Sequence, residues 1–324
     1  MAGFKAGYTT TTFKDSRRNR PVLVDLWYPA EETSREAPFD YRPGFGIVAE
    51  GAGCAVTAAP CVILSHGAFG AARNYSWIAE RLARSGYVVA GASHYGESFV
   101  YGPQTIDPLS ALQPWQRALD CSFVLDQLTA DARFGSMMDD RRIGALGHSS
   151  GGATALELAG AELDLAAMRR YCRSEEAAED RGCQYARQQG AAPPAAFPWQ
   201  TTPRRLLDGR IKAVVAMDPA LGPGHTDASL GMIEVPTLVV GAVQNDFLPY
   251  EHHAARYARL IRGAQHLALS DGEGHFVFLN EGTSEAQANG VPLYKDRNGV
   301  DRARVHETLA RSILPFLDTN LPDA

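Results

Sequence analysis

The segment that most constrains the fold is Arg142–Gly160, in which a short apolar stretch runs into GHSSG and then into a run of small, helix-forming residues. A serine on so sharp a turn needs almost side-chain-free neighbours two positions before and after it. Gly147 and Gly151 meet that need. The spacing G-x-S-x-G between a strand and a helix predicts that Ser149 is presented as a nucleophile, above the positive end of the helix. The alternative is a glycine-rich turn with an idle serine.

Strands alternate with helices along most of the chain. We predict strands at 8–13, 22–28, 61–64, 87–92, 143–146, 211–217, 236–241 and 265–269, and helices at 75–85, 109–131, 250–262 and 302–317. Residues 15–20 form a hairpin turn between the first two strands. This alternation predicts an α/β fold with a mostly parallel central sheet and helices on both faces, which together with the GHSSG turn is the α/β-hydrolase fold. We expect one domain, residues 1–324.

Two segments interrupt the alternation. Residues 31–59 form a long connection rich in Gly, Pro and Ala. Residues 162–207 separate the helix after the serine from the next strand, and they contain apolar residues at helical spacing, a charged stretch and a Pro-Pro pair. Because long insertions in compact folds are commonly functional, we expect 162–207 to be a cap over the site. The alternative is a surface excursion that makes no contact with substrate.

Composition excludes several classes of protein. The net charge is −6, and no run of Lys and Arg suggests nucleic-acid binding. No apolar run reaches the length of a membrane span, and the first residues lack the apolar core of a signal peptide. We therefore expect a cytoplasmic protein by default, or an exported one if a signal peptide has been removed. The oligomeric state is left open.

The chain has five cysteines, and their spacing predicts no metal site. We expect no cofactor. Cys61 and Cys121 lie in a predicted strand and helix, so we expect buried thiols. Cys172 and Cys183 flank a charged loop and could form a disulfide in an exported protein. Free thiols are the favoured interpretation, because disulfides are rare in the cytoplasm.

Acyl transfer by a serine needs a base beside Oγ, and His275 is the best candidate. It lies late in the chain, in the Gly-flanked loop that follows the last predicted strand. His306 lies in the terminal helix and is expected to be solvated. His148, inside the turn itself, and His266, in a strand, are expected to pack or to form local hydrogen bonds.

Two aspartates could orient that base. Asp218 is the first residue after the strand 211–217, whereas Asp246 lies further along, after the next strand. A carboxylate just past a buried strand is well placed for a shielded, charge-assisted bond to an imidazole N–H. We favour Asp218, although the order Ser, Asp, His holds for either residue. The other aspartate would stabilise its own turn.

An oxyanion hole should combine the backbone N–H of Ser150 with one from the loop that follows strand 61–64. In that loop Ala68 is the candidate donor, because flanking glycines let the backbone approach a reacting carbonyl. Phe69 and Phe276 lie inside the expected active-site loops, so we expect them to line a substrate pocket. Ordinary core packing is the alternative for other nearby aromatic residues.

Several linked motifs resemble the platelet-activating-factor acetylhydrolase family and its bacterial dienelactone-hydrolase-like relatives. They are VDLWYPA at 24–30, SHGA at 65–68, YS at 75–76, LARSGYVVA at 82–90, DPALG at 218–222 and GHF at 274–276. The resemblance covers most of the chain outside 31–59 and 162–207. It implies a Ser/Asp/His carboxylic-ester hydrolase that needs no metal.

Residue by residue, the resemblance implies that Ser149 is the nucleophile, Asp218 the acid and His275 the base, with the Ala68 and Ser150 amides as oxyanion donors. Ala68 replaces a larger apolar residue and Ser150 replaces a Phe, so phospholipid specificity does not carry over. Dienelactone hydrolases use a cysteine nucleophile, which this chain lacks at that position. We therefore expect an esterase for small or short-chain esters. An amidase or peptidase on the same fold, or a non-catalytic binding protein, are the alternatives.

Overall fold

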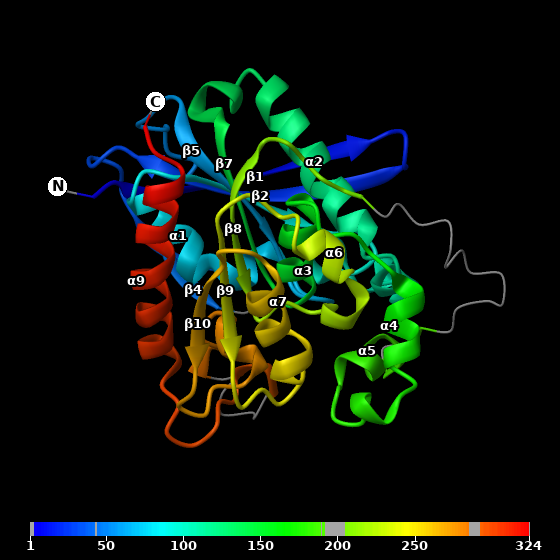
Figure 1. Ribbon diagram of the computed structural model, residues 1–324. Coiled ribbons are helices and arrows are strands. Elements are labelled where there is room, and N and C mark those ends of the chain that lie inside the picture. Colours follow the sequence, from blue (N-terminus) through cyan, green and yellow to red (C-terminus); the bar gives the residue numbers. More distant parts are fainter. Residues whose placement is uncertain (1–2, 43, 189, 192–204, 285–291, 324) are drawn as a thin grey trace.

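The computed structural model describes residues 3–42, 44–188, 190–191, 205–284 and 292–323. Its centre is a twisted sheet with the strand order β10-β9-β8-β7-β5-β6-β2-β1-β4-β3 (Figure 1). The strands are β1 Lys5–Asp15, β2 Arg20–Ala30, β3 Ala37–Asp40, β4 Phe45–Glu50, β5 Ala59–Ser65, β6 Val88–Ser93, β7 Met138–His148, β8 Ile211–Met217, β9 Thr237–Ala242 and β10 Gln265–Leu269.

Six neighbouring strands, from β6 through β5, β7, β8 and β9 to β10, pair in parallel. β1 and β2 form an antiparallel hairpin, and β2 joins this parallel part by pairing antiparallel to β6. Because parallel strands end at one edge of a sheet, the loops that follow β5, β7, β8 and β10 converge there. That edge is where the sequence places the candidate site residues.

Helices cover both faces of the sheet. The longer helices are α1 Ser76–Arg84, α2 Trp115–Ala130, α3 Ser150–Leu158, α7 Ala254–Leu260 and α9 Arg302–Asn320. One apolar core joins α2, α3 and α7 to one face of the sheet, and a second joins α1 and α9 to the other. In Figure 1, α9 lies beside α1, away from α2 and α3. The predicted α/β architecture is therefore confirmed. No helix within the described ranges is both long and apolar enough to cross a membrane.

Some predicted boundaries are wrong. The connection 31–59 contains a short hairpin, β3 with β4, at the end of the sheet beside β1. α2 begins at Trp115 rather than at 109, and Pro108–Leu112 is a separate 3₁₀ helix. The reason is Pro114, which lacks the N–H that a continuous helix would require. The helix predicted at 250–262 is also shorter, because α7 follows a 3₁₀ turn at Tyr250–His252.

His306 is buried, so the prediction that it is solvated is wrong. Its ring stacks on Trp77, with 4.0 Å between the ring centroids, and Nε2 donates a hydrogen bond of 2.9 Å to the Val277 carbonyl. Burial lowers the pKa of His306 to about 3. The imidazole therefore acts as a neutral core side chain that fixes α9 against the segment after β10.

The segment 162–207 contains α4 Leu165–Tyr171 and α5 Gly182–Gln188, while 192–204 lie outside the described residues. Cys172 and Cys183 form a disulfide between the end of α4 and the start of α5. The preference for free thiols at these two positions is therefore wrong. Charged residues fill most of the short loop between them, and a bridge closes that loop without the help of a large apolar core.

Candidate active site

Ser149 lies in the turn between β7 and α3, with a backbone φ of +56°. An L-residue adopts this conformation at an energetic cost, which is typical of functional turns. The two glycines allow the turn to close. A Cβ on Gly147 would lie 2.1 Å from the Gly151 carbonyl oxygen, and a Cβ on Gly151 would lie 1.9 Å from the Ser65 carbonyl oxygen. The steric reason for the G-x-S-x-G spacing is thus visible in the contacts.

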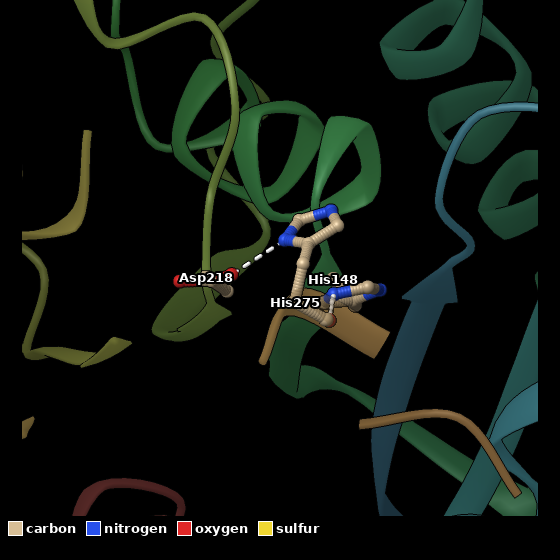
Figure 2. Close-up of side chains that lie close together, drawn as sticks. All are labelled: His148, Asp218 and His275. Atoms are coloured by element: carbon tan, nitrogen blue, oxygen red, sulfur yellow. Dashed lines mark hydrogen bonds and ion pairs between the residues drawn. The ribbon is translucent and has the colours of Figure 1, made fainter. Parts of the chain in front are cut away.

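Three distant loops bring a hydroxyl, an imidazole and a carboxylate into line. His275 Nε2 lies 3.0 Å from Ser149 Oγ, and His275 Nδ1 lies 2.5 Å from Asp218 Oδ2. All three side chains are buried, Ser149 at 7% exposure and the other two at no more than 2%. In this order Oγ donates to Nε2 and Nδ1–H donates to the carboxylate. Figure 2 shows the bond between Asp218 and His275.

Asp218, rather than Asp246, contacts the imidazole. It is the first residue after β8, has a φ of +43°, and its Oδ1 accepts a bond of 3.3 Å from the Ala242 amide. The Asp246 carboxylate instead accepts a bond of 2.9 Å from the backbone N–H of His275. One aspartate thus holds the imidazole ring, and the other holds the loop that carries it.

Asn245 is a further residue of the site, and its role was not predicted from the sequence. Its side-chain amide donates to Asp218 Oδ2, while its own Oδ1 accepts from the Phe247 and Leu248 amides at 2.8 Å each. Asn245 therefore fixes the Asp218 carboxylate and the turn after β9 together. The only sequence signal was an Asn-Asp pair just beyond a buried strand, which is common in ordinary turns.

His148 connects the candidate oxyanion loop to the loop of His275. Tyr75 Oη accepts from the Gly67 amide at 3.0 Å and donates to His148 Nδ1 at 2.8 Å. His148 Nε2 donates to the His275 carbonyl at 2.9 Å (Figure 2). Burial, followed by the neighbouring His275, lowers the pKa of His148 well below its ordinary value, so the ring stays neutral. The expectation of a local hydrogen-bonding role for His148 is confirmed.

The predicted oxyanion donors lie beside the nucleophile. Ala68, Ser149 and Ser150 line one cavity. Within the described ranges, the amides of Ala68 and Ser150 form no hydrogen bond to another group, whereas the Gly67 amide is engaged by Tyr75. Backbone amides that have no other partner and belong to residues lining a cavity beside a serine hydroxyl are candidates to stabilise a negative oxygen.

The cavity has a volume of about 400 Å³, within the range of small-ligand sites. Both predicted substrate-contacting residues, Phe69 and Phe276, line it. Tyr185 of α5 and Phe247 also line it, and neither was predicted. Their positions depend on contacts between segments far apart in the chain, which periodicity does not report.

His148, Asp218 and His275 also place possible metal-ligand atoms within 4.8 Å of one another. The ring nitrogens of His148 are already bonded to Tyr75 Oη and to the His275 carbonyl, and His275 Nδ1 is bonded to Asp218. A metal ion here would have to displace these hydrogen bonds. The donor set therefore fits a hydrogen-bonded relay better than it fits a metal centre.

The sheet order and the strained serine turn define an α/β protein with its site at the carboxyl ends of the strands. More specifically, residues 62–286 match the model of the alpha/beta hydrolase family, and the chain belongs to that family. Lipase 1 of Moraxella sp. (strain TA144) is 29% identical over 153 residues, or 47% of this chain. That alignment spans 42% of the lipase, less than half of its length.

A solved structure, a ferulic acid esterase from Streptomyces cinnamoneus, is similar over the whole fold. It matches with a TM-score of 0.62 and 22% identity, over 99% of this chain and 90% of that chain. At this level of identity the likeness shows the fold alone. The architecture is thus the same in both chains, and the chemistry of this one must be argued from its own residues.

Proposed function

We propose that this protein is a serine carboxylic-ester hydrolase for small or short-chain esters. Ser149 Oγ attacks the ester carbonyl carbon while His275 Nε2 takes its proton, and the Asp218 carboxylate stabilises the resulting imidazolium. The carbonyl oxygen becomes an oxyanion that accepts from the Ala68 and Ser150 amides. His275 then protonates the departing alcohol. Water, deprotonated by the same imidazole, releases the acid from Ser149.

The observation that carries this proposal is the unbroken order Asp218–His275–Ser149 with a strained serine at a cavity. Each contact supplies one requirement of acyl transfer: a base, a group that orients the base, and a nucleophile. The partial likeness to a lipase supports ester substrates. The narrower resemblance to platelet-activating-factor acetylhydrolases and dienelactone-hydrolase-like proteins stays a prediction from the sequence motifs.

The direct test is hydrolysis of 4-nitrophenyl acetate by the wild type and by His275→Ala. We expect turnover by the wild type and a loss of at least about 10³-fold in kcat for the variant. Unchanged kcat in a folded His275→Ala protein would reject the proposal. A matched anilide, 4-nitroacetanilide, should react far more slowly than the ester, and comparable kcat/KM values would indicate an amidase instead.

We also propose that the chain functions in an oxidising compartment. The Cys172–Cys183 disulfide supports this, because such bonds persist mainly in exported proteins. The proposal favours the exported alternative over the default expectation of a cytoplasmic protein. Mass spectrometry of protein from native cells, with free thiols blocked at lysis, should find these two cysteines oxidised. Alkylation of both would contradict it.

A further inference from the structure

Four aromatic rings form a continuous wall along the cavity, from the oxyanion loop to the imidazole. Phe69 packs edge-to-face on Tyr185, with 5.6 Å between ring centroids, and Tyr185 packs edge-to-face on Phe247 at 5.1 Å. Phe247 stacks on the ring of His275 at 5.0 Å and meets Phe276 edge-on at 5.4 Å. The middle of this wall, Tyr185, comes from the inserted segment 162–207 and not from the sheet.

The backbone around Phe69 favours a ligand-binding role for the wall. Phe69 has a φ of +58°, a conformation that costs free energy for a bulky L-residue. It lies directly after Ala68, one of the candidate oxyanion donors. The strained turn therefore sets the position of the Phe69 ring relative to the reacting carbonyl.

Contacts on several sides hold Tyr185 in place. The Cys172–Cys183 disulfide ends two residues before it. The Arg181 amide donates a bond of 2.9 Å to the carbonyl of Phe247, so the start of α5 is joined to the loop that follows β9. The buried Asp180 carboxylate lies 2.9 Å from His253 Nε2, and His253 also lines the cavity. The backbone that carries Tyr185 is thus held by a disulfide and by hydrogen bonds on neighbouring residues.

We propose that Tyr185 is a specificity-determining residue, and that the site takes esters carrying an aromatic ring next to the ester group. This inference rests on the proposed esterase function and adds the substrate class to it. Ring planes in the wall are turned by 70° at Phe69–Tyr185 and by 85° at Tyr185–Phe247. A flat ring beside them meets both an aromatic face and an edge, the arrangement that aromatic pairs prefer. A small alkyl group has too little surface to use this wall.

The test compares ethyl acetate, benzyl acetate and ethyl benzoate, with acid release followed by a pH indicator. The ratio of kcat/KM between variant and wild type, taken for each ester, removes differences in intrinsic reactivity. Tyr185→Ala should lower kcat/KM about tenfold more for at least one of the two aromatic esters than for ethyl acetate. Tyr185→Phe keeps the ring and should retain the wild-type ratio of kcat/KM between the aromatic esters and ethyl acetate. Gln184→Ala, an exposed position on the same helix, is the matched control.

The double variant Cys172→Ser/Cys183→Ser tests the same wall without touching its rings. In this double variant, kcat/KM should fall more for the aromatic esters than for ethyl acetate, which is still turned over. Two results would overturn the assignment of Tyr185 and leave the esterase proposal standing. One is an equal loss of kcat/KM for all three esters in Tyr185→Ala, and the other is no loss for either aromatic ester. No turnover of any of the three esters by the folded wild type would overturn both.

Discussion

Within the described part of the chain, two sets of Ser, His and Asp have the same order of hydrogen bonds. In the candidate site, His275 lies between Ser149 and Asp218. In the second set, His94 Nε2 lies 2.9 Å from the Oγ of Ser65, and His94 Nδ1 lies 3.1 Å from Asp120 Oδ2. The hydrogen-bond distances in the two sets are similar, so they do not by themselves identify the reactive serine.

The surroundings distinguish the two sets. Ser65 is the last residue of β5 and is 2% exposed, while His94 and Asp120 are fully buried. No member of this second set is among the described residues that line the cavity. Asp120 also forms ion pairs with Arg18 at 2.7 Å and Arg20 at 3.0 Å. Of the two serines, only Ser149 lies on a strained turn and lines the cavity, beside the candidate oxyanion donors.

The second set has a structural use beside the oxyanion loop. The His94 amide donates a bond of 3.0 Å to His66 Nε2, and His66 Nδ1 donates to the Gly67 carbonyl at 2.6 Å. Burial raises the pKa of Asp120, but the hydrogen bond from His94 and the positive charge of Arg20 outweigh it and bring that pKa to about 2. The carboxylate is therefore a fixed anion that holds the ends of β5 and β6.

The largest contrast is expected between the two serines. Ser149→Ala should lower kcat for 4-nitrophenyl acetate by about 10⁵-fold or more, because no other group can form the acyl-enzyme. Ser65→Ala should change kcat by less than threefold and lower the free energy of unfolding by about 1–3 kcal/mol, since it leaves His94 Nε2 without its partner. Steady-state kinetics and urea unfolding of both variants measure this. A Ser65→Ala protein without activity but with wild-type stability would contradict the assignment.

Substitution of Asp218 should mainly lower activity, whereas substitution of Asp120 should mainly lower stability. Asp218→Asn is expected to lower kcat by about 10³–10⁴-fold with a small change in Tm, because the amide cannot stabilise the imidazolium. Asp120→Asn should cost about 3 kcal/mol of stability, because it removes the anion paired with Arg20 and leaves Arg18 with Asp15 alone, while the folded fraction keeps its kcat. Calorimetry alongside kinetics gives both numbers. Inactivity of folded Asp120→Asn would mean that the second set takes part in catalysis.

A smaller effect is expected at Asn245; among the described residues, no side-chain amide donates to Asp120 in the second set. Asn245→Ala removes the donor to Asp218 Oδ2 and the acceptor for two turn amides. We expect kcat to fall about tenfold with little change in KM, since the carboxylate is then held less firmly. Asn245→Asp keeps the turn acceptor and provides the matched comparison. Wild-type kcat in Asn245→Ala would show that Asp218 is held sufficiently by its backbone.

The smallest predicted effect concerns pH. Burial, followed by the charge of Arg117, lowers the pKa of His94 below its ordinary 6.5, although Asp120 opposes this shift. Below pH 6.5 the unfolded chain therefore binds a proton that the folded chain excludes, and the stability provided by neutral His94 declines as the pH falls. The slope of the free energy of unfolding against pH should therefore be smaller in His94→Gln, by at most about 1.4 kcal/mol per pH unit. Urea unfolding at pH 7.5, 6.5 and 5.5 measures it, and equal slopes in both proteins would contradict it.

The parts of the site that depend on local spacing could be predicted from the sequence. Gly147 is required by a contact within the turn, and Gly151 by the close approach of the Ser65 carbonyl at the end of β5. The spacing of both glycines around Ser149 is nevertheless visible in the pentapeptide itself. Asp218 directly follows an apolar strand, and His275 occupies a glycine-flanked loop after the last strand. Parallel strands bring both positions to one edge of the sheet. Sequence order therefore implied the proximity of these loops.

The missed features depend on contacts between distant segments. Tyr185 lies in an insertion whose docking is set by a disulfide and by a bond to the Phe247 carbonyl, and no periodicity reports either. Asn245 is recognisable only once its neighbour Asp218 is placed. His306 is different, because it lies on the same helical face as Val305 and Leu309. Its burial is therefore predictable from the spacing of its apolar neighbours on the helix.

The central claim is that Ser149, and not Ser65, is an activated nucleophile. Reaction of the folded protein with a fluorophosphonate probe, followed by mass-spectrometric mapping of the labelled peptide, tests it most directly. We predict one adduct, on Ser149, none on Ser65, and no adduct in Ser149→Ala. An adduct on Ser65, or an unlabelled Ser149 in protein that still hydrolyses esters, would contradict the account.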